Sequence, residues 1–123
     1  MRGKVYLLNT LIVPINFDKY EEAEIEVKRI TKEEFCKTIK DALREGKLVN
    51  AIGHEGTAKL IAEMCEIPLK AERKTVFFKE GDIGLHIFLK QRLPEGVVLT
   101  KEELEKLPMW LVKSKVINIV EKR

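Results

Sequence analysis

The chain has 123 residues, of which 45% are hydrophobic and 35% are charged. This length suits one domain that buries about two thirds of its unfolded surface around a single core. The net charge of +3, from 23 basic and 20 acidic residues, indicates a mixed surface that permits a small anionic ligand. It excludes a polybasic stripe, so no long nucleic acid is expected as a partner. The charged composition, with one Ser and one Gln in the whole chain, predicts a thermophilic source.

The first predicted element is a central strand of the sheet at residues 5–8, which is apolar throughout and ends at Asn9. This run is too short for a signal segment or a membrane span. We therefore expect no membrane partner and a cytoplasmic location, the host cytoplasm if a virus encodes the protein. An irregular stretch follows, and then a half-exposed strand at residues 23–30, where Ile25 and Val27 alternate with charged residues.

A helix is expected next. Thr31 is its predicted cap, because Glu34 completes a capping box three residues later, and Gly46 marks its end. Its apolar residues recur at helical spacing and are expected on one buried face: Phe35, Ile39 and Leu43.

The second half of the chain continues the alternation of strands and helices. The expected elements are a strand at 48–52, a helix at 57–65, a hairpin of 75–79 with 85–90, a short helix opened by a capping box of Thr100 and Glu103 and ended by Pro108, and a strand at 116–120. No linker or internal repeat interrupts this pattern. The sequence therefore predicts an α/β fold over residues 1–123, a single domain with a mixed β-sheet flanked by α-helices.

Cys36 and Cys65 lack the spacing of a metal site or a redox motif. Each falls on the apolar side of a predicted helix. We interpret both as buried free thiols in a reducing cytoplasm, not as a disulfide or a zinc site. The sequence contains no cluster that would bind a metal well, so we expect neither metal nor cofactor.

The turn Gly53-His54-Glu55-Gly56-Thr57 lies between an apolar run and a helical pattern. Unpaired backbone N–H groups at a helix start and an imidazole meet there, where a phosphate could be held and protonated. Ligands of helix-flanked sheets usually bind at such strand ends. The simpler interpretation of the turn alone is a helix start. His86 lies mid-strand without a partner at fixed spacing, and we interpret it as a structural or surface residue.

A second group of polar residues ends another strand-like run before a Pro/Gly turn: Gln91, Arg92 and Glu95. Alone, an arginine three residues before a glutamate is often a solvated strand end. Together with His54, these residues supply the acid, cation and carboxylate of metal-free phosphodiester chemistry.

Four segments resemble the viral ring nuclease family, the type III anti-CRISPR proteins: 4–9 (Lys-Val-Tyr-Leu-Leu-Asn), 34–36 (Glu-Phe-Cys), 50–57 (Asn-Ala-Ile-Gly-His-Glu-Gly-Thr) and 91–96 (Gln-Arg-Leu-Pro-Glu-Gly). The resemblance spans nearly the full length. Members degrade cyclic tetra-adenylate, the second messenger that activates antiviral effector nucleases. The resemblance implies a metal-independent phosphodiesterase that leaves linear products with 2′,3′-cyclic phosphate ends, because the ribose 2′-hydroxyl of the ligand is the nucleophile.

The resemblance also implies roles for individual residues. His54 is similar to the general acid, Arg92 to the cation that contacts phosphate, and Glu95 to the carboxylate that supports them. The implied ligand contacts are Asn9, Thr10, Gly53, Gly56, Thr57, Arg73 and Gln91. The chain departs from the family at two of these positions, since many members have a serine shortly after the asparagine, near Thr10, and a serine in place of Gly56.

A cyclic tetranucleotide is large for one small subunit, and its repeat suits a two-fold site. We therefore expect a homodimer that holds the ring across its axis. Other functional classes remain open. One is a non-catalytic sink for a cyclic nucleotide or a small nucleic-acid-binding regulator, and another is an interaction module whose charged faces are only solvated.

Overall fold

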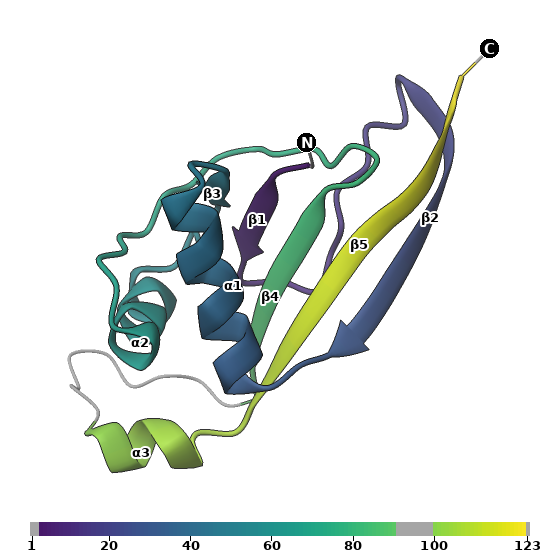
Figure 1. Ribbon diagram of the computed structural model, residues 1–123. Helices are drawn as coiled ribbons and strands as arrows, with labels where there is room; N and C mark the ends of the chain where they lie inside the picture. Colours follow the sequence, from purple (N-terminus) through teal and green to yellow (C-terminus); the bar gives the residue numbers. More distant parts are fainter. Residues whose placement is uncertain (1–2, 91–99, 123) are drawn as a thin grey trace.

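The computed structural model describes residues 3–90 and 100–122. Within these ranges, five strands form one mixed sheet in the order β2-β5-β4-β1-β3, and three helices lie beside it (Figure 1). The elements are β1 (Val5–Leu8), β2 (Tyr20–Arg29), α1 (Lys32–Arg44), β3 (Leu48–Asn50), α2 (Glu55–Cys65), β4 (Ile83–Leu89), α3 (Lys101–Lys106) and β5 (Met109–Glu121). The predicted α/β class with a mixed sheet is confirmed.

β1 pairs in parallel with β3 on one side and with β4 on the other, whereas β5 runs antiparallel to both β4 and β2. The expected first strand is therefore an interior strand, as its apolar sequence predicted, and all of its residues are buried. β2 is an edge strand with a mostly exposed burial pattern, which agrees with its alternating charges. None of the helices in the described ranges is long and apolar enough to cross a membrane.

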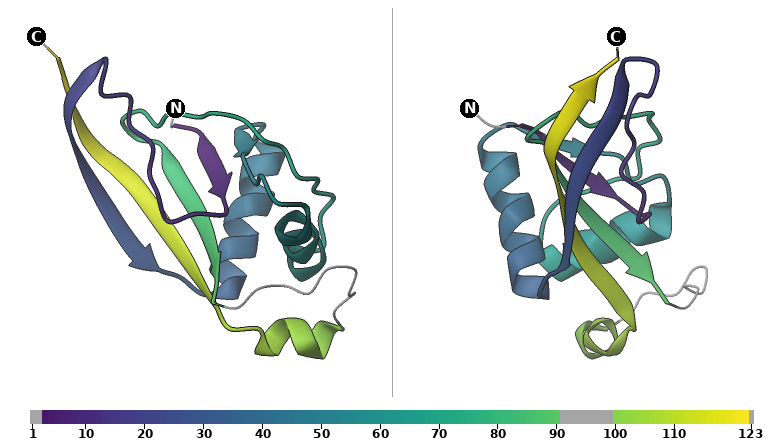
Figure 2. Two further views of the ribbon diagram at one scale, coloured as in Figure 1. Left: turned by 180° about the vertical axis from the view of Figure 1, so that it is seen from behind. Right: turned by 90° about the vertical axis from the view of Figure 1, so that its right-hand side faces the viewer.

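Helices α1 and α2 cover one face of the sheet (Figures 1 and 2). Val5 and Leu7 of β1 point to this face because side chains alternate along a strand. They pack with fully buried helix residues such as Phe35, Ile39 and Ile61. Each of these buried side chains contributes about 1.5–3 kcal/mol relative to an exposed one, so this layer is the main core of the fold.

The opposite face is covered, among the described residues, by irregular segments instead of helices (Figure 2). Tyr6 and Leu8 of β1 point to this side and pack with Ile15 and Phe78 from two connections. The rings of Tyr6 and Phe78 stack with centroids 4.5 Å apart. This second, smaller cluster holds both connections against the sheet.

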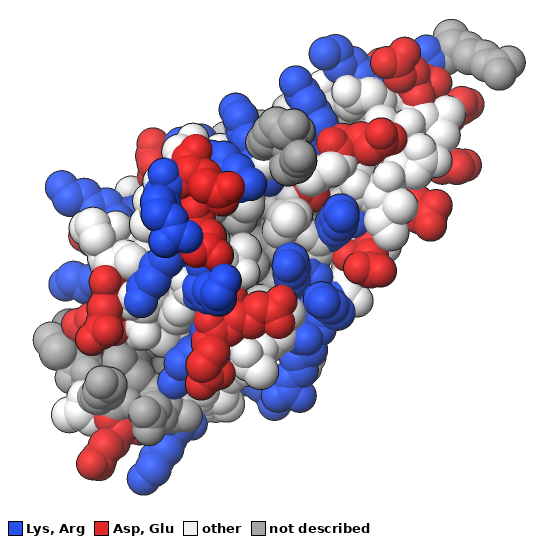
Figure 3. Space-filling view, viewed as in Figure 1, with Lys and Arg blue, Asp and Glu red and all other residues white. Residues whose placement is uncertain are grey.

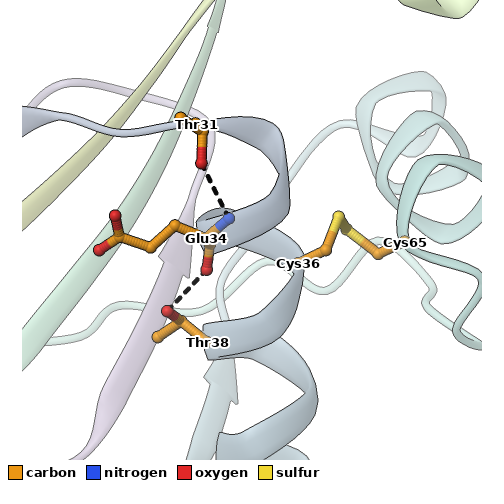
Figure 4. The surroundings of a disulfide bond; sticks show 5 residues. All are labelled: Thr31, Glu34, Cys36, Thr38 and Cys65. Carbon is orange, nitrogen blue, oxygen red and sulfur yellow. Dashed lines mark hydrogen bonds between the residues drawn. A yellow bond between two sulfur atoms is a disulfide. The ribbon is translucent and has the colours of Figure 1, made fainter.

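Helix α1 begins at its predicted cap, but among the described residues no bond from the N–H of Thr31 to Glu34 completes the capping box, because Oε2 of Glu34 lies 3.7 Å from Nζ of Lys113 instead. Thr31 is its N-cap, and Oγ1 of Thr31 accepts a hydrogen bond from the backbone N–H of Glu34 at 3.1 Å (Figure 4). The predicted buried face is wrong at one position, because Leu43 is 44% exposed and Ala42 is buried instead. Residue 42 lies about 20° around the helix from residue 35, whereas residue 43 lies about 80° away and reaches the solvent side.

The predicted hairpin of residues 75–79 with 85–90 is wrong. Both edges of β4 are occupied, by β1 and by β5, so residues 75–79 have no free edge to pair with. They instead run outside the sheet, where the N–H of Phe78 donates to the carbonyl of Pro14 at 2.9 Å. The predicted turn does form, since the N–H of Asp82 donates to the carbonyl of Lys79 at 3.0 Å. The last strand also begins earlier than expected, at Met109, because its first half pairs with β4.

Lysine, arginine, aspartate and glutamate side chains are interspersed over the face that carries α1 (Figure 3). On α1 itself, Nζ of Lys37 lies 3.1 Å from Oδ2 of Asp41, and Arg44 pairs with the same carboxylate. These pairs are exposed and contribute little stability each. The mixed surface that the composition predicted is thus seen on this face.

Cys36 of α1 and Cys65 of α2 form a disulfide, with their Cα atoms 5.1 Å apart (Figure 4). The prediction of free thiols is wrong. Spacing gave no sign of the pair, because the two cysteines are 29 residues apart and meet only when both helices pack on one face of the sheet. The covalent loop encloses β3 and the 53–57 turn.

We predict that removing this disulfide lowers the free energy of unfolding by about 3–4 kcal/mol, since the bridge restricts a long loop of the unfolded chain. Urea unfolding with and without reductant measures the effect. The double variant Cys36→Ala/Cys65→Ala is the control and should be insensitive to reductant. Equal stability of the oxidised and reduced parent protein would contradict the prediction.

Candidate functional site

The carboxyl ends of β1, β3 and β4 lie at the same end of the sheet because these strands are parallel (Figure 1). The chain leaves β1 towards the far edge strand β2, whereas it leaves β3 through α2 and returns as β4 on the other side of β1. The first connection packs on the face without helices and the second on the helical face, so the two diverge at the ends of β1 and β3. Such divergence opens a crevice where ligands bind in helix-flanked sheets.

His54 is the N-cap of α2, with extended backbone at φ −119° and ψ 122°. Its Nδ1 accepts a hydrogen bond from the backbone N–H of Thr57 at 3.2 Å, and Oγ1 of Thr57 lies 3.3 Å from the same nitrogen. Because Nδ1 accepts this bond, the ring carries its proton on Nε2. The sequence placed His54 correctly between a strand and a helix, but its part in closing the helix end was not predicted.

Asn9 and Arg73 converge on the residue before His54. Oδ1 of Asn9 accepts a long hydrogen bond from the N–H of Gly53 at 3.4 Å, and Nε of Arg73 donates to the carbonyl of Gly53 at 3.3 Å. A Cβ at position 53 would lie 3.3 Å from Cγ of Arg73, so a larger residue there would require the Arg73 side chain to shift by a few tenths of an ångström. The structure thus brings together four of the predicted site residues from three separate segments.

Asn50 also shapes the turn, and the sequence reasoning missed its role. Oδ1 of Asn50 accepts from the N–H of Ile52 at 3.0 Å, and Nδ2 donates to the carbonyl of Lys70 at 2.6 Å. The N–H of Glu72 adds a bond to the carbonyl of Ile52 at 2.7 Å. These bonds fix the segment that carries Arg73 beside the turn. An asparagine at a strand end was the available signal, because its side chain commonly bonds backbone two residues on.

Of the six remaining predicted site residues, three lie within the described residues and three lie outside them. Gly56 and Thr57 lie in the first turn of α2, where Thr57 is buried. Thr10 follows Asn9, and its carbonyl faces His86. The other predicted site residues lie outside the described residues: Gln91, Arg92 and Glu95. Their roles stay predictions.

His86 is buried, 1% exposed, so its interpretation as structural is confirmed and the surface alternative is wrong. Nδ1 of His86 lies 2.7 Å from the carbonyl oxygen of Thr10, and Nε2 lies 2.7 Å from Oγ of Ser114. Burial holds the pKa of His86 below its usual range, and the bond to Thr10 opposes this shift in part. The ring is thus neutral at neutral pH.

Within the described part of the chain, no three His, Cys, Asp or Glu side chains lie together in a way that could hold a metal ion. A cavity of about 570 Å³ lies at the start of α1, and His54 is not among the residues that line it. Its lining residues come from the end of β2 and the segment that joins it to α1, the first turn of α1, and β5 with the residue two positions before it: Arg29, Ile30, Thr31, Lys32, Glu34, Leu107, Met109 and Leu111. It contains none of the predicted site residues.

The profile of the STIV B116-like family matches residues 5–111. Among solved structures, B116 of Sulfolobus turreted icosahedral virus has a TM-score of 0.84 and 31% identity, over 92% of this chain and 99% of that chain. Among sequences, ORF117 of Acidianus two-tailed virus is 40% identical over 82% of this chain and 83% of its own length. YddF of Bacillus subtilis is 29% identical over 84% of this chain and 88% of its own length. The Sulfolobus and Acidianus viruses are compatible with the predicted thermophilic source.

The lowered pKa of His86 predicts that the fold loses stability in mild acid. Below pH of about 6.5 the unfolded chain binds a proton at this residue and the folded chain does not. The free energy of unfolding should therefore fall by at most about 1.4 kcal/mol per pH unit until the folded pKa is reached. Urea unfolding at pH 7.5 and pH 5.5 tests this, with His86→Asn as the control. Equal acid losses in parent and variant would contradict it.

Proposed function

The chain belongs to the STIV B116-like family, and from the site around His54 we propose that it is a metal-independent ring nuclease. Its proposed substrate is cyclic tetra-adenylate, and its products are linear adenylates with 2′,3′-cyclic phosphate ends. This reaction would switch off type III CRISPR effector signalling. The observation that carries the proposal is the gathering of Asn9, Gly53, His54 and Arg73 at the start of α2.

Phosphate binding is supported by the first turn of α2. The N–H groups of Glu55 and Gly56 belong to the first turn of α2 and have no acceptor within the helix. They carry the positive end of the helix dipole, which favours an anion. The bond from Nε of Arg73 to the carbonyl of Gly53 places the guanidinium beside the residue before His54. A phosphate of the ring placed here would meet backbone donors and a cation together.

In the proposed reaction, the ribose 2′-hydroxyl attacks the adjacent phosphorus and the bond to the 5′-oxygen breaks. The protein therefore has to align the ring, stabilise charge on the phosphate oxygens and protonate the leaving oxygen. His54 is exposed and its Nε2 points away from the helix cap, since Nδ1 is the atom that binds Thr57. Nε2 is the atom that would give the proton. Arg92 and Glu95 would complete the charge stabilisation, as the resemblance to ring nucleases implies.

Proton transfer from His54 requires the imidazolium form, which carries a proton on both nitrogens. A proton on Nδ1 would break the bond from the N–H of Thr57. Oγ1 of Thr57, 3.3 Å from Nδ1, can accept a bond from the protonated ring instead. The Thr57 hydroxyl can therefore pair with Nδ1 of His54 in either protonation state.

A second candidate function follows from the same contact. As a neutral helix cap, His54 donates a hydrogen bond from Nε2 but no proton, which suits a sink that binds the cyclic nucleotide without cleaving it. A nucleic-acid-binding regulator would instead show a steep salt dependence of binding. Intact ring recovered after denaturation of the protein would identify the sink.

We predict that His54→Ala lowers the rate of cleavage by about 10²–10⁴-fold, the usual share of a general acid. Much of the ring binding should remain, because several contacts share it. The alanine variant also loses a helix cap, at about 0.5–2 kcal/mol. His54→Asn is the matched control, because asparagine caps helices well but transfers no proton. It should restore stability and not cleavage.

The assay is incubation with cyclic tetra-adenylate in EDTA, followed by chromatography of the products. Turnover of His54→Asn within a few-fold of the parent would remove the histidine from the mechanism. Unchanged ring after incubation with a stoichiometric amount of parent protein would reject the enzyme in favour of the sink.

We also propose a homodimer, and the sheet face without helices supports it. Three apolar side chains on that face are exposed: Val27 at 61%, Phe88 at 39% and Trp110 at 41%. The rings of Phe88 and Trp110 stack with centroids 5.3 Å apart. The rings of Phe88 and Trp110 lie at the carboxyl end of β4. His54 lies at the same end of the sheet. Contact between two copies here would place two sites near one axis, an arrangement that suits the repeat of a cyclic tetranucleotide.

Light scattering at micromolar concentration should therefore give the mass of a dimer. Trp110→Glu should shift the mass towards the monomer, because it places a charge in the apolar contact. Leu43→Glu is the matched control, since Leu43 is equally exposed but lies on α1. A monomer mass of the parent, with and without the ring, would overturn the proposed dimer.

A further inference from the structure

His86 takes part in a buried hydrogen-bond arrangement outside the proposed chemistry. A backbone carbonyl only accepts hydrogen bonds, so Nδ1 of His86, 2.7 Å from the oxygen of Thr10, must carry the proton. Nε2 is then the acceptor, and the hydroxyl of Ser114 donates to it at 2.7 Å. These two partners thus define one neutral tautomer of His86. The ring lies between the connection that follows β1 and strand β5.

The sheet is shaped around this pair. Ser114 is 0% exposed and sits on the strand next to His86. A Cβ at Gly84 would lie 2.5 Å from Nε2 of His86, would come nearer still to Oγ of Ser114, and would also press on the ring of Phe78 at 3.0 Å. Only glycine leaves room at that position. Gly84 therefore leaves the space that the hydrogen-bonded pair of His86 and Ser114 needs.

The far end of this arrangement reaches the candidate site. Thr10 accepts the bond from His86, and the residue before it, Asn9, accepts the bond from the N–H of Gly53. The start of the connection from β1 to β2 is thus fixed at two successive residues, one to the sheet and one to the His54 turn. We propose that His86 is a positioning residue of the ring-binding site, which acts through Thr10 to hold Asn9 in place for the ligand. This inference rests on the proposed function.

A histidine is suited to this position for a physical reason. An apolar side chain would fill the space but would leave the carbonyl of Thr10 and the hydroxyl of Ser114 without their partner. Burial lowers the pKa of His86, so the neutral ring that bonds both partners persists at neutral pH. The contact to Thr10 therefore stays in place under the conditions of the reaction.

Two amide variants separate the contacts of the ring. In His86→Asn the side-chain nitrogen takes the place of Nδ1 and can still donate to Thr10, whereas in His86→Gln it takes the place of Nε2 and reaches Ser114 instead. We expect kcat/KM for cyclic tetra-adenylate to stay within about threefold of the parent in His86→Asn and to fall about tenfold in His86→Gln. The loss should appear mainly in KM, because the contact of Asn9 is made before the reaction.

Hydrogen exchange of the 9–19 segment, measured without ligand, is the second readout. Exchange should be faster than in the parent for His86→Gln and near the parent for His86→Asn. Ser114→Ala is the control that removes the other partner and should leave KM and this exchange near the parent values. Equal losses in the two amide variants, or parent kinetics in His86→Gln, would overturn the positioning role.

Failure of the positioning role of His86 and failure of the proposed function give different results. If the parent neither binds nor cleaves the ring, the ring nuclease proposal fails, and faster exchange only in His86→Gln would still support the fixing of the loop by His86. If His86→Gln does not fold, a long-range ¹H–¹⁵N spectrum of the parent decides. A neutral ring protonated on Nδ1 supports the arrangement, and a ring protonated on Nε2 or on both nitrogens overturns it.

Discussion

The parallel pairing of β1 with both β3 and β4 is the constraint on which the site depends. This pairing places the carboxyl ends of three strands at the same end of the sheet, so residues far apart in sequence meet there. Asn9 follows β1 and the Gly53-His54 turn follows β3, and they bond directly across the gap between these strands. Without the pairing of β1 and β3, the same residues would form a strand end and a helix start without contact.

Side chains from several segments form hydrogen bonds with the backbone of the His54 turn and of the segment beside it. Asn50, Asn9, Arg73 and His54 itself each bind a backbone group of residues 52–57 or of the segment beside them. Such satisfaction of backbone groups keeps an exposed turn in one conformation. The same contacts set a chemical limit, because the imidazole that caps the helix has only one nitrogen left for a ligand.

The two faces of the sheet are stabilised in different ways. The helical face has a large apolar core and the Cys36–Cys65 disulfide, which closes a loop around the site. The other face has a smaller cluster, a buried histidine with both nitrogens bonded, and exposed apolar residues such as Trp110. The helical layer therefore supports α2 from one side, while on the other side His86 bonds the connection after β1 to the sheet.

The sequence by itself determined what depends on local pattern. It predicted the fold class, the interior strand at 5–8, the N-cap at Thr31, the capping box of Thr100 and Glu103 and the strand–turn–helix position of His54, because periodicity and capping act over a few residues. Only the tertiary structure decided that residues 75–79 leave the sheet, that Cys36 bonds Cys65, and which partners His86 binds. These features depend on which strand edges are occupied and which helices share a face, and no short stretch of sequence carries that information.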